Sequence, residues 1–130
     1  MILVDSSVWI DFFNGIVCPE TDKLDEILGL EEVVIGDLIL AEVLQGFRKD
    51  SDYKTAKNIL TSLTVHDLLG TQMAIKSADN YRKLRKKGFT IRKTADVIIA
   101  TYCIDNKIPL LFTDKDFKPF VDHLRLKVAT

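Results

Sequence analysis

The sequence predicts a three-layer α/β/α sandwich, in which helices cover both faces of a central parallel β-sheet of four or five strands. Short runs of β-branched and aliphatic residues alternate with longer stretches of helical periodicity, which is the pattern of βα units. The chain has 130 residues, of which 47% are hydrophobic, so it suffices for one compact core and is short for two. We therefore expect a single domain over residues 1–130.

The strands are expected where short apolar runs stand between polar stretches. The candidates cover residues 2–4, 33–35, 64–66, 109–112 and 124–128. The runs at 2–4, 33–35 and 109–112 have the clearest strand character. In the last of these, Pro109 stands at the start, where a missing N–H group is tolerated.

The helices are expected in the intervening stretches, where apolar residues recur with helical spacing. They cover residues 7–14, 21–30, 38–48, 52–63, 71–87 and 94–106, followed by a short turn after Asp114. Crossovers between parallel strands are right-handed, which limits the topology of the sheet.

Bulk properties exclude several classes of protein. No run approaches the roughly 20 apolar residues that span a bilayer, and Met1 leads into residues 2–4 without the basic start of a signal peptide. Cys18 and Cys103 are far apart, without C-x-x-C spacing or clustered histidines, so we expect no zinc site. These features indicate a cytosolic protein without a membrane segment.

The formal net charge of −1 is unevenly distributed along the chain. From Arg82 to Lys93 there are seven basic residues and no acidic one, whereas the rest of the chain is acidic. Such a segment is either a solvated helix end, where basic side chains suit the helix dipole, or a phosphate-binding surface.

Four acidic residues are set against hydrophobic elements instead of lying in polar stretches. They are Asp5 after residues 2–4, Glu42 within residues 38–44, Asp96 near the start of 94–106, and Asp114 after residues 109–112. An ionised carboxylate is rarely buried without a partner, because its desolvation costs several kcal/mol. Basic residues are scarce near these acids in the sequence, apart from Lys93 by Asp96 and Lys115 by Asp114, so a bound cation is the simplest compensation.

The expected topology brings these acids to one edge of the sheet. Asp5 and Asp114 follow strands, and ligands of parallel sheets bind beyond the carboxyl ends of the strands. Glu42 and Asp96 are expected in the early turns of helices that begin at that edge. Each acid also has a structural alternative, because Asp5, Asp96 and Asp114 suit helix starts or turns and Glu42 suits a solvated face.

A site built from carboxylates alone suits Mg²⁺ or Mn²⁺ and a phosphate substrate. Such ions activate water and neutralise charge on the leaving oxygen, which fits phosphodiester hydrolysis. The chain has no G-x-x-x-x-G-K-[ST], G-x-G-x-x-G or G-x-S-x-G motif, and His66 and His123 do not form a cluster in the sequence. The expected metal ligands and catalytic residues are Asp5, Glu42, Asp96 and Asp114.

Each of the four acids lies in a short recognisable segment. The segments are ILVDSSVWID at 2–11, LAEV at 40–43, KTADVIIA at 93–100 and TDKDF at 113–117. In this order and spacing they resemble the PIN-domain family, and more narrowly the VapC ribonuclease toxins of bacterial and archaeal toxin–antitoxin pairs. The resemblance covers residues 1–128 and implies the PIN-like α/β/α fold, with an acidic pocket for one or two Mg²⁺ or Mn²⁺ ions. It also implies endonucleolytic cleavage of RNA, often a transfer RNA or a ribosomal RNA loop.

The resemblance gives roles to neighbouring residues as well. Ser6 matches the small hydroxyl residue after the first acid, which orients ligands or phosphate. The last motif of the family varies between Asp114 and Asp116; we expect Asp114 to be the ligand, with Thr113 and Asp116 in supporting positions. The expected RNA-binding residues are Arg85, Lys86, Arg92 and Lys93.

The partners that the resemblance implies are a second copy of the chain, in a homodimer, and a cognate antitoxin protein. The C-terminal segment of such an antitoxin lies along the groove of the toxin and often sends a basic side chain into the acidic pocket. That side chain satisfies the same electrostatic demand as a metal ion.

Two other functions stay open. A phosphatase of the haloacid-dehalogenase type would use Asp5 as its nucleophile, but the D-x-D motif of that class has Ser7 at its second acidic position here. A non-catalytic module would use the acidic cleft to capture a basic peptide, and it would neither bind Mg²⁺ or Mn²⁺ nor cleave RNA.

Overall fold

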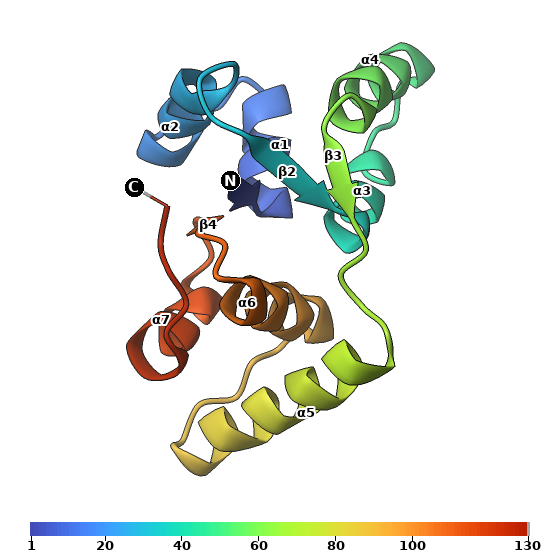
Figure 1. The fold of residues 1–130 in the computed structure, drawn as a ribbon. Helices are drawn as coiled ribbons and strands as arrows, with labels where there is room; N and C mark the ends of the chain where they lie inside the picture. Colours follow the sequence, from blue (N-terminus) through green and yellow to red (C-terminus); the bar gives the residue numbers. More distant parts are fainter. Residues whose placement is uncertain (130) are drawn as a thin grey trace.

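Four parallel strands form a single sheet in the computed structural model, which describes residues 1–129 (Figure 1). The strands are β1 (Ile2–Val4), β2 (Val33–Gly36), β3 (Thr64–His66) and β4 (Leu110–Leu111), in the spatial order β3-β2-β1-β4. β1 pairs with β2 and β4, and β2 pairs with β3. The predicted parallel sheet is therefore confirmed.

Seven α-helices and one 3₁₀ helix connect the strands within residues 1–129. They are α1 (Ser6–Phe13), α2 (Pro19–Ile27), α3 (Asp37–Leu44), α4 (Asp50–Thr61), α5 (Thr71–Lys86), α6 (Thr94–Asn106), η1 (Lys115–Phe117) and α7 (Lys118–Leu124). α1 packs against α2 and α3, and α3 packs against α4, on one face of the sheet; α6 and α5 lie on the other face (Figure 1). This is the predicted three-layer α/β/α sandwich.

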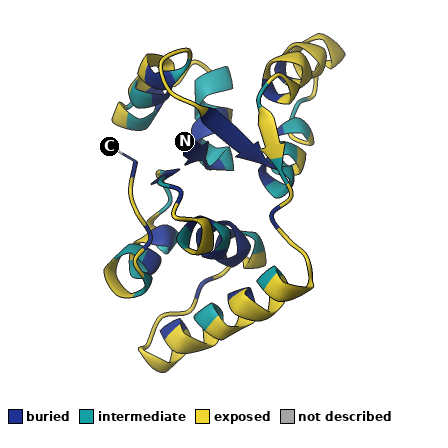
Figure 2. Ribbon diagram, viewed as in Figure 1, coloured by how far each residue is buried: buried dark blue, intermediate teal, exposed yellow. Residues whose placement is uncertain are grey.

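The core lies between the two helical layers. β1 and β2 are buried along their whole length, and so are Asp96 to Thr101 in α6 (Figure 2). α6 is apolar on nearly all sides because it packs against α5 as well as against the core, and a helix that is apolar all round is a buried helix. The largest fully buried side chains include Trp9, Phe117 and Phe120.

The sheet reverses its direction of winding at β1. The chain moves from β1 to β2 and β3 on one side and returns to place β4 on the other. The carboxyl ends of β1 and β4 therefore lie next to each other, at the switch point where open α/β sheets bind ligands. The residues that follow these two strands are Asp5 and, after a short loop, Asp114.

The C-terminal part of the chain differs most from the sequence prediction. The short turn expected after Asp114 continues into α7, and the strand expected at 124–128 is wrong, because Leu124 ends α7 and only Val128 forms an isolated bridge with Leu110. α3 also ends at Leu44, four residues before the predicted end. The reason for α7 is tertiary: Phe120 is fully buried, but a helix of seven residues is too short to show a clear period.

No helix within residues 1–129 combines the length and the apolar character that a bilayer-crossing helix requires.

Candidate metal centre and active site

Asp5 lies directly after β1 and is the N-cap residue of α1. Its Oδ2 accepts hydrogen bonds from the Ser7 backbone N–H at 3.4 Å and from the Ser7 hydroxyl at 2.8 Å. Its Oδ1 is buried and has no hydrogen-bond partner within residues 1–129, although the residue is only 3% exposed. The helix-capping alternative for Asp5 is thus correct for one carboxylate oxygen, and the other oxygen remains available to a ligand.

Ser7 connects the two strand ends at this edge. Besides its bond to Asp5, its hydroxyl lies 3.2 Å from the Thr113 hydroxyl, which follows β4. The sequence prediction gave the supporting hydroxyl role to Ser6 and missed Ser7. The signal was present, because an N-cap carboxylate usually bonds the residue two or three positions later.

Asp96 occupies the first turn of α6 and is 5% exposed. Its Oδ2 is buried without a hydrogen-bond partner in the described chain. The pKa of Asp96 is raised to about 7: burial is the main cause, the nearby charges of Asp5, Asp114 and Glu42 add to it, and Lys93 opposes them. A carboxyl with such a pKa is half protonated near neutrality unless a cation compensates its charge.

Glu42 lies in the second turn of α3, within the early turns where it was predicted, and is half-buried. Its Oε1 is buried and lacks a partner among the described residues. Burial is the main cause that raises the pKa of Glu42, and the charge of Asp5 adds to it; Lys93 and the Ser6 hydroxyl counteract both. Burial also raises the pKa of Asp5, with a smaller contribution from Asp114.

Asp114 and Asp116 complete the acidic group. Carboxylate oxygens of Asp96, Asp114 and Asp116 all lie within 4.8 Å of one another. Asp114 caps η1, because its Oδ1 accepts a hydrogen bond of 2.9 Å from the Asp116 backbone N–H. Asp116 in turn accepts a bond of 3.3 Å from Arg92 Nε. Both candidates for the fourth position thus lie beside Asp96.

At the carboxyl edge of the sheet, carboxylate oxygens of Asp114 and Asp116 thus lie within 4.8 Å of Asp96, and Asp5 and Glu42 lie near enough for their charges to raise the pKa of Asp96. The charges of neighbouring acids raise the pKa of Asp5, Glu42 and Asp96, and each of these three has a buried oxygen without a hydrogen-bond partner among the described residues. None of the ion pairs within residues 1–129 involves Asp5, Glu42, Asp96 or Asp114. Oxygen donors of this type are the preferred ligands of Mg²⁺ and Mn²⁺, so the residues fit a hard divalent cation.

The four predicted RNA-binding residues take different positions. Lys93 precedes α6 and lies near enough to Asp96 and Glu42 to lower the pKa of both. Arg92 is held by Asp116. Arg85 and Lys86 lie on the last turn of α5, where the Arg85 guanidinium carbon stands 5.5 Å from the centre of the Tyr81 ring. Arg92 and Lys93 thus lie beside the acidic residues of the candidate site.

Similar proteins share this fold and sequence over nearly the whole chain. A VapC ribonuclease of Mycobacterium bovis and the ribonuclease VapC11 of Mycobacterium tuberculosis are each 27% identical over 135 residues, which span 100% of this chain and 98% of each relative. A solved structure of VapBC2 from Rickettsia felis, bound to a promoter DNA fragment, matches 99% of this chain and 98% of that chain with a TM-score of 0.77 and 19% identity.

Two further solved structures are similar. A toxin–antitoxin complex from Klebsiella pneumoniae has a TM-score of 0.67 and 20% identity, with 90% of each chain covered. VapC20 of Mycobacterium tuberculosis, a toxin that cleaves the sarcin–ricin loop, has a TM-score of 0.69 and 15% identity, with 91% of this chain and 93% of that chain covered. The sequence profile of the PIN domain matches residues 2–120. As the sequence motifs predicted, this chain belongs to the PIN domain family.

Proposed function

We propose that this protein is an endoribonuclease that depends on Mg²⁺ or Mn²⁺ and acts as the toxin of a toxin–antitoxin pair. One observation carries the proposal: in a chain of the PIN domain family, buried oxygens of Asp5, Glu42 and Asp96 lack a hydrogen-bond partner within residues 1–129, and the charge of Asp5, which follows β1, raises the pKa of the other two. Its relatives of similar length are VapC ribonucleases, which supports RNA as the substrate.

The ion would be held by Asp5, Glu42, Asp96 and Asp114, with Asp116 as a supporting carboxylate. Asp116 shares one oxygen with Arg92, whereas Asp114 uses one oxygen to cap η1, so each keeps a second oxygen for a ligand. When bound, the ion supplies Lewis acidity, which activates water and neutralises charge on the scissile phosphate.

The chain's own residues hold this arrangement in place. Ser7 fixes the Asp5 carboxylate and contacts Thr113, so the ligands that follow β1 and β4 keep their relative position. Lys93 offers a cation beside the acidic pocket, and Arg92, Arg85 and Lys86 extend the positive surface along which the RNA backbone binds. The basic side chains would bind phosphates of the RNA backbone, while the carboxylates would hold the ion at the phosphate that is cleaved.

The proposed partners are an antitoxin protein and a second copy of this chain. Two of the solved proteins with this fold come from a VapBC pair and a toxin–antitoxin complex, which supports an antitoxin. A basic side chain from the antitoxin would bind the same unpaired carboxylates as the ion and thereby exclude it. We expect a homodimer, and light scattering that finds only monomer at micromolar concentration would contradict it. The proposed substrate is a transfer RNA or a ribosomal RNA loop.

Neither alternative function gains support from the site. The position that a phosphatase of the haloacid-dehalogenase type needs for its second aspartate is occupied by Ser7, whose hydroxyl binds Asp5. A pure peptide-binding module would not need three carboxylates with raised pKa facing one another.

The first test measures cleavage of purified transfer RNA and ribosomal RNA by the protein in the presence of Mn²⁺. The second test maps the ends of cellular RNA after expression of the protein has been induced. Asp5→Asn and Asp96→Asn should each abolish cleavage, because each removes a ligand charge. The matched control is Asp25→Asn, which changes an exposed aspartate of α2 and should cleave like the unaltered protein. Equal cleavage by all four proteins, or dependence on a phosphoaspartate at Asp5, would refute the proposal.

A further inference from the structure

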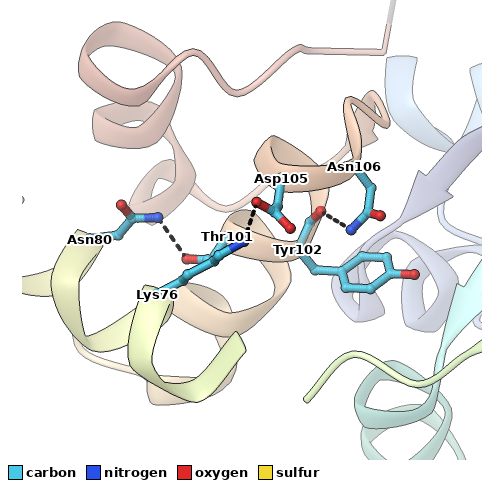
Figure 3. Close-up of polar contacts among 6 residues, drawn as sticks. All are labelled: Lys76, Asn80, Thr101, Tyr102, Asp105 and Asn106. Carbon is cyan, nitrogen blue, oxygen red and sulfur yellow. Dashed lines mark hydrogen bonds and ion pairs between the residues drawn. The ribbon is translucent and has the colours of Figure 1, made fainter. Parts of the chain in front are cut away.

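α5 and α6 form an antiparallel pair that is closed along only one flank. Figure 3 shows that Lys76 pairs with Asp105 at 2.8 Å and that Asn80 donates a hydrogen bond of 3.0 Å to Thr101. Ser77 and Leu84 are the buried residues of α5, which packs against both α6 and α7. A neighbouring row of α5 side chains, spaced three and four positions apart along the helix, faces the other flank of the pair. We call this flank, which lacks such polar contacts, the open flank.

The open flank contains a cavity of about 450 Å³. Its sides come from Ile91, Val97 and Ile98, and its rim carries Tyr81, Arg82 and Arg85. Ser77 also lines it; this serine is only 5% exposed, and its hydroxyl has no hydrogen-bond partner within residues 1–129. The cavity thus combines apolar walls, one unsatisfied polar atom and two cations, and its volume lies in the usual range of ligand sites.

The cavity lies on the opposite side of α6 from the acidic pocket. Thr94 lines the cavity and Asp96 belongs to the acidic pocket, and both stand in the first turn of α6. Residues that are two positions apart in a helix point about 200° apart around its axis. Thr94 and Asp96 therefore lie on opposite sides of α6, and the two sites are separated by roughly one helix diameter, about 10–12 Å. Arg92 and Lys93 lie in the chain just before this turn, so cations border the path from one site to the other.

We propose that this cavity receives one unstacked base of the RNA substrate, while Arg82 and Arg85 bind the neighbouring phosphates. A base has apolar faces that suit the aliphatic walls and the Tyr81 ring, and polar edges that can bond the Ser77 hydroxyl. The positive rim favours a polyanion over an apolar peptide or a second copy of this chain. The proposal rests on the proposed function, because it assigns a subsite for the same RNA.

Binding in EDTA tests the cavity without cleavage. The probes are a single-stranded RNA pentamer of random sequence and a chain of five ribose phosphates without bases. We expect the RNA to shift the methyl NMR signals of Ile91, Val97 and Ile98, and to bind at least about tenfold more tightly than the base-free chain. Equal affinity of both probes, or shifts confined to the basic residues, would overturn the proposal.

Filling the cavity provides a second measurement. Ala78 lines the cavity and is exposed, so Ala78→Phe should occupy the space while melting at the temperature of the unaltered protein. It should remove the tenfold preference for RNA with bases. Gln72→Phe, on an exposed position of α5 outside the cavity, is the matched control and should keep that preference. A preference retained by Ala78→Phe would overturn the proposal.

Failure of the cavity and failure of the nuclease assignment give different results. If RNA is cleaved in Mn²⁺ but the cavity methyl signals do not respond to the pentamer, only the base-binding proposal is overturned. If the signals respond and the preference for bases is found, but Asp96→Asn cleaves as well as the unaltered protein, the base site stands and the proposed catalytic site fails. Methyl shifts that depend on protein concentration without RNA would identify a second copy as the occupant and overturn the base site.

Discussion

Asp96 shows what burial of a carboxylate costs in this molecule. It is 5% exposed, one of its oxygens has no hydrogen-bond partner in the described part of the chain, and it lies near other acids; its pKa of about 7 reflects that environment. The same causes raise the pKa of Asp5 and Glu42. Without a bound cation, ionisation of these residues therefore opposes folding.

The stability of the metal-free protein should fall as pH rises from about 4 to about 7. In this window the unfolded chain, with an aspartate pKa of 3.8, has released a proton that folded Asp96 still holds, so deprotonation favours unfolding. We expect a higher melting temperature in EDTA at pH 5.5 than at pH 8, measured by scanning fluorimetry. Asp96→Asn is the control and should show a weaker dependence, because an amide does not titrate; the same dependence in both proteins would contradict the prediction.

Substitution of Ser7 distinguishes the orientation of the Asp5 carboxylate from direct binding of the metal ion. Its hydroxyl makes the 2.8 Å bond to Asp5 and the 3.2 Å contact with Thr113, but it is not proposed as a metal ligand. Ser7→Ala should weaken Mn²⁺ binding by about tenfold or more in calorimetry, because residues that orient ligands contribute on this scale. Ser51→Ala, at an exposed position of α4, should leave the affinity unchanged. Equal affinities in all three proteins would show that Asp5 does not depend on Ser7.

At the scale of elements, α3 and α6 matter because both start at the carboxyl edge of the sheet and carry Glu42 and Asp96. The entry into α3 is tight. Gly36 ends β2 and is the N-cap residue of α3, and a Cβ atom at this position would lie 2.3 Å from Leu68 Cδ1. Leu68 is fully buried, so its side chain has little freedom to move away. The glycine is required here for close packing.

Gly36→Ala should destabilise the protein by about 1–3 kcal/mol, as measured by urea unfolding, because it overpacks the site of Leu68. Leu68→Ala alone should also destabilise it, through the cavity that it leaves. The double variant should be more stable than the sum of the two losses implies, since each change relieves the defect of the other. Additive losses would show that the two residues do not compete for the same space.

At the scale of the whole molecule, binding of a divalent ion should increase the stability of the protein against thermal unfolding. A ligand that binds only the folded state stabilises it by about 2.7 kcal/mol at a hundredfold excess over its Kd. For a chain of this size we expect Mn²⁺ or Mg²⁺ to raise the melting temperature by several degrees. Potassium chloride at matched ionic strength is the control, and the double variant Asp5→Asn with Asp96→Asn should lose the effect. An equal rise in both proteins would place the ion elsewhere.

Much of the fold could be predicted because the spacing of hydrophobic residues along the chain indicates which side chains are buried. The runs at 2–4 and 33–35 became β1 and β2, and the predicted bounds 94–106 are those of α6. The four acids were recognisable because each interrupts an apolar element, and such a charge needs a partner. The contact of Ser7 with Thr113, the pairing of Arg92 with Asp116 and the extent of α7 were not predicted, since they depend on contacts between distant or very short segments.

The sequence by itself determined the alternation of strands and helices, the membership of the PIN domain family, and which carboxylates would be costly to bury. Only the tertiary structure decided which of their oxygens have no partner among residues 1–129, that Asp114 and Asp116 both lie beside Asp96, and that a cavity opens between α5 and α6. The physical reason is that periodicity and composition act along the chain, whereas desolvation, charge interactions and packing depend on distances in space.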